Sequence, residues 1–394
     1  MTKFLVKHFI KDSENFKDPL VRENYGKLAG VIGIISNLIL CIIKVLVGVV
    51  SSSIAIIADG INNLTDASSS VITLIGFKLS SMPEDEDHPY GHARIEYLTG
   101  LIVSILIIIV GIGVLKTSIG KILNPQTLEF SIATIVVLIV AICIKLWQSL
   151  FNKTIGKKIN SLTLIATATD SRNDVIATSI VLISVIITKV TGLQLDGYLG
   201  CLVALFIIWS GYCLIRETSS PLLGEAPDSE LVMSITNIVN SYDGVLGMHD
   251  LVVHNYGPGK VFASLHVEVD AAKDVMESHD MVDNIEREIS SKLHIHFVIH
   301  MDPILRNDPV INEVLPTLVD CITQIDGVYN MHDLRAVKGP THTNIIFDLA
   351  ITINCPLTQK EIFNIVQDEL HKLNANYFVV ITFDKAYTKI VYDD

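Results

Sequence analysis

Long apolar runs separated by short polar stretches dominate the first 218 residues of the chain. A membrane-spanning helix needs about 20 mostly apolar residues. Six stretches have that character: 28–50, 54–80, 95–117, 130–152, 160–190 and 195–216. The second and the fifth also contain acidic and amide residues. The pattern predicts a membrane all-α six-helix bundle.

The hydrophobic period changes after residues 219–231, a segment with two prolines and a glycine. Residues 260–270 ("KVFASLHVEVD") and 294–302 ("HIHFVIHMD") alternate apolar and polar positions, as half-buried strands do. The residues between them read as an amphipathic helix. With a further helix near 228–241 and a strand near 245–254, the order is αββαβ, which predicts a small α+β domain.

An internal repeat follows this domain. The segment "YDGVLGMHDL" at 242–251 recurs as "IDGVYNMHDL" at 325–334, and "FVIHMD" at 297–302 is echoed by "FVVITFD" at 378–384. A second αββαβ unit is therefore expected. In this alignment Ile381 and Phe383 replace His300 and Asp302, so the repeat is predicted to keep the fold and lose the polar pair.

Composition supports a membrane protein. Half of the residues are hydrophobic and 18% are charged, against about 25% in soluble domains. Residues 1–224 contain 18 Lys/Arg and 16 Asp/Glu, a net +2, whereas residues 225–394 contain 11 and 26, a net −15. The second half is therefore acidic and water-soluble in character. It has no basic face that could neutralise phosphates, which argues against a nucleic-acid partner.

The positive charges of the first half predict its orientation. Lysines and arginines gather in the N-terminal tail, in the loop at 153–158 and at Arg216, on one side of the expected bundle. The positive-inside rule places this side, and both termini, in the cytoplasm. The polar, lysine-bearing N-terminus does not resemble a cleaved signal peptide. The six scattered cysteines do not suggest a disulfide framework.

Two pairs of polar residues stand in the second and fifth apolar stretches. Asn62 and Asp66 are four residues apart, as are Asp170 and Asp174, so each pair projects from one helix face. If the two helices pack together, three carboxylates and an amide oxygen converge, which is typical of a divalent-cation site. Alternatively, these side chains only hydrogen-bond one another or pair with Arg172. Arg172 itself points away from Asp170, and a pairing with Asp59 or a position at the membrane interface are the alternatives for it.

At these residues the sequence resembles the cation diffusion facilitators, a family of divalent-metal/proton antiporters. The resemblance covers about residues 25–304 and rests on "ADGINNLTDA", "DHPYGHARIEY", "DSRND", "LLGEAPD" and the "HDL…H…H…HMDP" series. It implies six transmembrane helices, a cytoplasmic ferredoxin-like domain that dimerises, and a transport site at Asn62, Asp66, Asp170 and Asp174. It also implies four regions: a cytoplasmic tail (1–27), the transport domain (28–218), the ferredoxin-like domain (219–304) and a degenerate repeat (305–394).

The residue at position 170 bears on the metal. Zinc-type relatives usually carry histidine where this chain has Asp170, so the sequence is similar to the manganese-exporting branch. An oxygen-only site also suits Mn²⁺ better than Zn²⁺. Export of Zn²⁺, Fe²⁺ or Cd²⁺ remains open, as does a metal-gated sensor or channel without proton coupling. No nucleophile–base pair or phosphate-binding glycine loop suggests an enzyme, and no cofactor is expected.

Further metal ligands are implied by the resemblance. Asp85, His88 and His92 match a secondary site in the loop between the second and third helices, although solvated histidines would give the same pattern. A regulatory site at a dimer interface is implied by His249, His266, His279, His300 and Asp302. Alternatively, these residues bind no metal and are simply the polar side chains on the solvent-facing side of amphipathic strands. Together these features predict a multi-pass protein of the cytoplasmic membrane whose partners are a divalent metal, protons, lipid and a second copy.

Overall fold

The computed structural model describes residues 2–16, 18–50, 54–123, 132–191, 196–305, 308–352 and 354–385. Its internal contacts divide the chain into two compact units. The first comprises Met1–Glu225 with Asn255–Lys260, and the second Ala226–His254 with Val261–Asp394.

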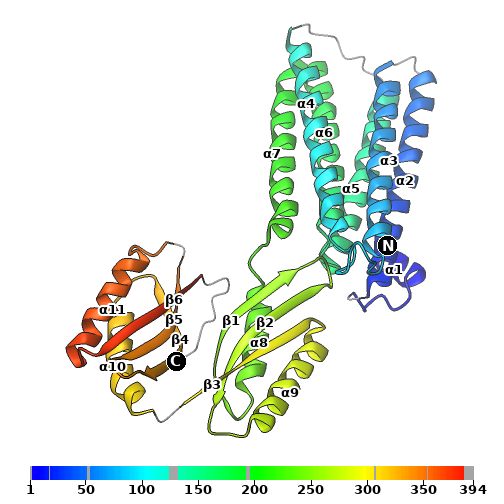
Figure 1. The fold of residues 1–394 in the computed structure, drawn as a ribbon. Coiled ribbons are helices and arrows are strands. Elements are labelled where there is room, and N and C mark those ends of the chain that lie inside the picture. The colour runs from blue at the N-terminus through cyan, green and yellow to red at the C-terminus, as the bar shows by residue number, and fades with distance from the viewer. Residues whose placement is uncertain are drawn as a thin grey trace. The chain divides into compact units, whose positions relative to one another are not determined.

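The first unit is helical (Figure 1). Its helices are α1 (Thr2–Phe9), α2 (Pro19–Val50), α3 (Ile54–Ser80), α4 (Ile95–Leu123), α5 (Ile132–Lys158), α6 (Leu162–Thr191) and α7 (Asp196–Leu223). Helix α2 packs along α3, α4 along α7, and α5 along α6. Helix α6 also contacts α3, α4 and α7, so its polar residues face other helices of the unit.

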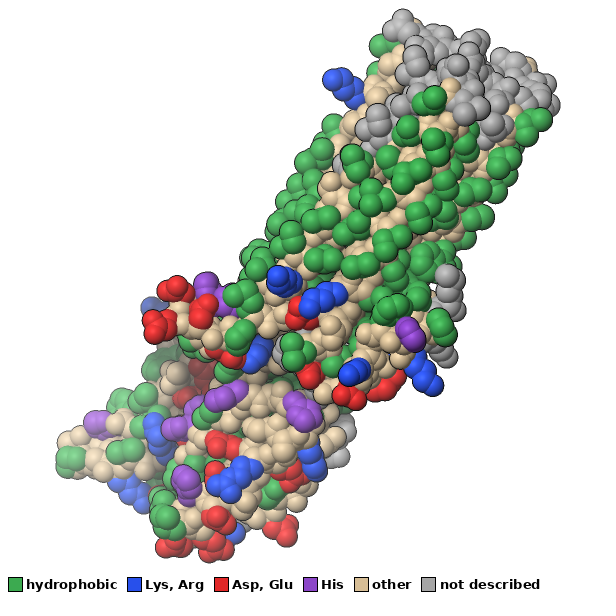
Figure 2. Space-filling model, turned by 90° about the vertical axis from the view of Figure 1, so that its right-hand side faces the viewer, with side chains coloured by type: hydrophobic (Ala, Val, Ile, Leu, Met, Phe, Trp, Pro, Cys, Tyr) green, Lys and Arg blue, Asp and Glu red, His purple; other side chains and the backbone are tan. Residues whose placement is uncertain are grey.

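Four segments within the described residues are long and apolar enough to cross a membrane: Leu20–Val47, Ile95–Leu123, Ile135–Lys158 and Gly197–Leu223. Hydrophobic side chains cover the face of this unit seen in Figure 2. The chain is therefore a membrane protein. That α3 and α6 also cross stays a prediction, because both carry the polar residues that interrupt their apolar runs.

A buried ion pair joins α2 to α4. Arg22 Nη2 lies 3.0 Å from Glu96 Oε2 and 3.1 Å from Oε1, and Arg22 Nη1 also donates to the carbonyl of Ile159. Thr163 Oγ1 donates to the carbonyl oxygen of Glu96 at 2.5 Å, which brings the start of α6 to the same point. Helices α2, α4 and α6 and the residue that follows α5 are thus tied together at one end of the first unit.

The second unit contains two successive αββαβ arrangements. The first consists of α8 (Ser229–Asn240), β1 (Val245–Asn255), β2 (Val261–Asp270), α9 (Val275–Leu293) and β3 (His296–Ile304). The second consists of α10 (Pro309–Thr323), β4 (Val328–Lys338), β5 (Thr343–Ile351), α11 (Gln359–Leu373) and β6 (Tyr377–Lys385). The sheets have the orders β1-β2-β3 and β4-β5-β6, with β2 parallel to β3 and β5 parallel to β6.

Each arrangement has its own core. Alternate residues of β2 and β5 pack against the helices beside them, with Leu265 and Phe347 completely buried. The predicted strand at 294–302 begins later than expected. His294 instead ends α9 in the left-handed conformation, with φ of 55°, and the strand starts at His296. His294 therefore does not share the strand face with His296 and His300.

Candidate metal centres

Three aspartates from two helices meet inside the first unit. Asp66 comes from α3, and Asp170 and Asp174 come from successive turns of α6. One carboxylate oxygen of each lies within 4.8 Å of those of the other two. Two donors of one divalent ion at ~2.2 Å from it can be about 4.4 Å apart, so small side-chain shifts would place all three on one ion. The helical spacing thus brings together the acids that the sequence singled out.

Asn62, the fourth predicted ligand, lies in α3 one turn before Asp66. Its side chain falls outside the described part of the structure, so its assignment as a ligand stays a prediction.

Lys145 of α5 is part of the same cluster, and the sequence analysis did not identify it. Its Nζ donates to Asp66 Oδ2 and to Asp174 Oδ2, both at 2.6 Å, and only 6% of its side chain is exposed. Lysine is rare inside apolar spans and normally pairs with a buried acid. A lone lysine in the middle of the apolar run 132–152 was the signal that could have revealed it.

Further polar side chains are buried in α2, α5 and α6. Asn37 Oδ1, Gln148 Oε1, Asn152 Oδ1 and both amide atoms of Asn173 make no hydrogen bond among the described residues. Buried polar atoms are normally satisfied by protein or water. These atoms are therefore candidate sites for water or a passing hydrated ion within the helical unit.

Arg172 turns away from the aspartates. Its Nη2 donates to Ser210 Oγ at 3.3 Å, and its guanidinium carbon lies 5.8 Å from the ring centre of Phe206, both on α7. Asp59, the partner considered from the sequence, is outside the described side chains. Within the described part of the chain, Arg172 thus serves as a contact between α6 and α7.

The predicted loop site is assembled. His88 Nδ1 lies 3.2 Å from Asp85 Oδ1, and His92 Nε2 lies 3.4 Å from Asp85 Oδ2. The backbone N–H of His88 also donates to Asp85 at 2.7 Å and holds the pKa of that carboxyl below its usual value. The three side chains can share an ion, but His88 and Asp85 are largely exposed, so solvated residues explain the geometry equally well.

The cytoplasmic histidines are brought together in part. His266 Nδ1 lies 2.9 Å from Asp302 Oδ2, and His249 Nε2 lies 3.3 Å from the same oxygen. His300 is at the edge, with its Nε2 3.3 Å from Asp302 Oδ1. His279, in contrast, is exposed on α9 and belongs to none of the ligand groups found among the described residues.

The expected loss of the polar pair from the second repeat is wrong for Asp302, whereas His300 is replaced by Thr382. The buried residues of β2, Ala263 and Leu265, recur in β5 as Ile345 and Phe347, and buried Phe297 of β3 recurs in β6 as Val379, which gives an offset of 82 residues for these strands. At this offset Asp302 corresponds to Asp384. Matching the letters "FV" gives an offset of 81 instead. A one-residue shift in a strand exchanges its two faces, and this shift concealed the acid.

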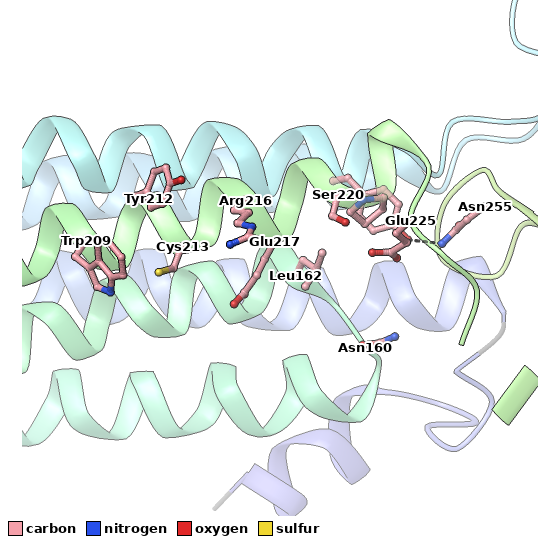
Figure 3. Close-up of a pocket in the computed structure, with 12 residues that line it drawn as sticks. Asn160, Leu162, Trp209, Tyr212, Cys213, Arg216, Glu217, Ser220, Glu225 and Asn255 are labelled. Carbon is pink, nitrogen blue, oxygen red and sulfur yellow. Dashed lines mark hydrogen bonds between the residues drawn. The ribbon is translucent and has the colours of Figure 1, made fainter. Parts of the chain in front are cut away.

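A separate cavity of about 620 Å³ lies beside α7 (Figure 3). Its wall includes Trp209, Tyr212, Arg216 and Glu217, and Asn255 Nδ2 donates to Tyr97 Oη at its edge at 3.3 Å. None of the three clustered aspartates lines it, so this cavity is distinct from the candidate transport site.

Two family models match the chain. Residues 30–223 match the cation efflux transmembrane domain, and residues 227–304 match the cytoplasmic domain of cation efflux proteins. The chain belongs to the cation efflux, or cation diffusion facilitator, family, which is a family of transporters and not of enzymes. The family resemblance seen in the sequence is thereby confirmed.

Several curated relatives are similar over most of their length. An uncharacterized transporter of Methanocaldococcus jannaschii is 31% identical over 273 residues, which are 69% of this chain and 96% of that protein. The manganese efflux system protein MneS of Bacillus subtilis is 29% identical over 71% of this chain and 96% of its own length. The cation-efflux pump FieF of Serratia proteamaculans is 27% identical over 67% of this chain and 88% of its own length. The second αββαβ repeat lies beyond both matched family segments.

Proposed function

We propose that this protein exports a divalent metal ion from the cytoplasm in exchange for protons. The observation that carries the proposal is the convergence of Asp66, Asp170 and Asp174 from α3 and α6. Three carboxylates inside a helical membrane unit need a cation to balance them. Membership of the cation efflux family supports export as the direction.

Mn²⁺ is the favoured substrate. The described donors of the cluster are all carboxylate oxygens, and Asn62 would add an amide oxygen. Oxygen donors suit Mn²⁺, whereas imidazole and thiolate donors suit Zn²⁺. The similarity to MneS supports this choice. Because the chain is also similar to cation-efflux pumps called FieF, other divalent metals are tested as alternative substrates.

Lys145 gives the site a suitable charge. Three ionised carboxylates and one ammonium sum to −2, which a divalent ion neutralises. The Lys145 ammonium lies between Asp66 and Asp174 and compensates them. An incoming metal ion therefore has to displace this ammonium from the two carboxylates. Lys145 thus competes with the metal ion for Asp66 and Asp174, and it balances the charge of these carboxylates when no metal is bound.

Protons would complete the cycle. Carboxylates release a bound metal when they are protonated, so protons entering from the outside favour metal release there. We further propose that the protein lies in the cytoplasmic membrane with both termini inside, as the distribution of lysines and arginines indicates. Homodimer formation through the cytoplasmic domain is proposed from its family match.

Metal flux into proteoliposomes tests the site. Asp170→Ala and Asp174→Ala should each abolish Mn²⁺ transport, because each removes one of three converging ligands. Asp320→Asn serves as a matched control, because Asp320 is exposed on α10. Undiminished flux in both aspartate variants would show that the metal passes elsewhere.

Two further measurements on the same vesicles distinguish an antiporter from a channel and identify the transported metal. An antiporter changes the luminal pH as metal moves, whereas a channel without proton coupling passes metal with no such change. A panel of Mn²⁺, Zn²⁺, Fe²⁺, Cd²⁺ and Co²⁺ identifies the substrate.

A further inference from the structure

The two cytoplasmic repeats carry equivalent polar residues at three positions. His332 in the second repeat corresponds to His249, 83 residues earlier. At the offset of 82 given by the buried strand positions, Asp348 corresponds to His266 and Asp384 to Asp302. The second set is also assembled, since one ligand atom of each residue lies within 4.8 Å of the others.

The two sets touch each other. The rings of His249 and His332 are stacked, with their centres 4.0 Å apart and an angle of 29° between them. His332 Nε2 lies 3.6 Å from Asp250 Oδ2 of the first repeat and 3.6 Å from Asp384 Oδ2 of the second. The polar side chains of the two repeats are thus in direct contact through His249, Asp250 and His332.

The histidines at the centre are buried, and three of their four ring nitrogens have no hydrogen bond. The side chains of His249 and His332 are each only 4% exposed. Within the described part of the chain, His249 Nδ1 lies 3.4 Å from Asp250 Oδ2, whereas His249 Nε2 and both ring nitrogens of His332 make no hydrogen bond, although carboxylates lie at 3.3 to 3.6 Å. A buried polar atom without a partner destabilises a protein by about 1–3 kcal/mol. A metal ion bound to His332 Nε2 would remove that penalty for this atom.

The charges around the histidines favour a cation. Asp250 Oδ2 and Asp384 Oδ2 each lie 3.6 Å from His332 Nε2, and Asp348 offers a further carboxylate oxygen to the same group. Three carboxylates therefore lie near one imidazole.

We propose that His332, Asp348 and Asp384, together with Asp250 from the first repeat, form a binding site for a divalent transition metal that links the two repeats. A single imidazole with several carboxylates accommodates Mn²⁺, Fe²⁺ and Zn²⁺. The site is separate from the set His249, His266 and Asp302, which the family resemblance implied. It assigns a function to the second repeat, which the matched family segments do not include.

Binding at this site would hold the repeats together. Asp250 belongs to the first repeat and the other three ligands to the second, so the ion cross-links two separately packed cores. Any ligand that binds the folded form alone raises its stability according to its concentration and affinity. The second repeat is therefore expected to become more resistant to unfolding when metal is present.

Metal counting on the purified full-length protein in detergent tests the proposal. The background carries Asp66→Asn, Asp170→Asn and Asp174→Asn, so that the transport site contributes nothing. Bound Mn²⁺ and Zn²⁺ are counted by equilibrium dialysis with elemental analysis. His332→Ala and Asp384→Asn should each lower the count of at least one of these metals by one ion per chain. His342→Ala, at an exposed histidine of the same repeat, should leave it unchanged.

Two results would overturn the proposal. One is an unchanged count of both metals in His332→Ala and in Asp384→Asn. The other is an equal loss in His342→Ala, which would indicate unspecific binding. If His332→Ala does not fold, Asp348→Asn provides the same comparison at a partly exposed position. Because the background is already inactive in transport, failure here leaves the proposed function untouched, and loss of flux in the aspartate variants leaves this site untouched.

Discussion

Replacing Lys145 with methionine tests how the metal-free site is balanced. Methionine has a similar length and removes the ammonium that contacts Asp66 and Asp174 at 2.6 Å. With an effective dielectric constant of 20, each contact contributes about 6 kcal/mol of attraction. Desolvation of the buried charges offsets several kcal/mol of this. Removing one member of such a pair therefore leaves a net change of about 3 kcal/mol.

This change should appear in metal binding and in transport with opposite signs. The metal no longer has to displace the ammonium, so the Kd for Mn²⁺ should fall by on the order of 100-fold, since about 1.4 kcal/mol is a factor of ten. Turnover should fall by about tenfold or more, because release now leaves three uncompensated carboxylates.

The assay combines Mn²⁺ titration of the detergent-solubilised protein with flux into proteoliposomes. Lys145→Arg is the matched control, because it keeps the positive charge. The reasoning is refuted if Lys145→Met leaves both Kd and turnover unchanged. Weaker binding in Lys145→Met would equally refute it, because Lys145 would then assist the metal and not compete with it.

Three other changes give distinct expectations. Arg22→Ala should destabilise the protein by about 3–5 kcal/mol, because it leaves the carboxylate of Glu96 buried without its partner; thermal unfolding in detergent measures this, and the exposed Lys27→Ala should shift the midpoint little. Asp170→His should raise Zn²⁺ flux relative to Mn²⁺ flux, because imidazole suits zinc; an unchanged ratio would speak against position 170 as a selector. Arg172→Ala should retain most Mn²⁺ flux, because Arg172 contacts Ser210 and Phe206 and not the aspartates; complete loss of flux would contradict this placement.

The helical part of the fold was largely predictable because lipid imposes a simple pattern. An apolar run of about 20 residues identifies a span without knowledge of its neighbours. The i,i+4 spacing of Asp170 and Asp174 likewise fixes their common face. What the pattern could not give is which helices become neighbours. Lys145 lies on α5, and only the packing of α5 against α6 brings it to the acids.

The cytoplasmic site shows a different limit. A strand has a period of two, so an error of one residue in aligning the repeats reverses inward and outward positions. The buried positions of β5 and β6 correct this, and Asp384 lies beside His332. The buried strand positions, which the letters alone do not show, were needed to recognise the second set of ligands.

Mn²⁺ accumulation driven by a pH gradient tests the central claim most directly. Proteoliposomes are prepared with an acidic lumen and are given Mn²⁺ at equal concentration on both sides. Proton movement out of the lumen should drive Mn²⁺ inward above its external concentration, and the double variant Asp170→Asn, Asp174→Asn should show no accumulation. Equal accumulation in the double variant, or no accumulation by the unaltered protein despite a maintained gradient, would contradict metal/proton exchange at the aspartate cluster.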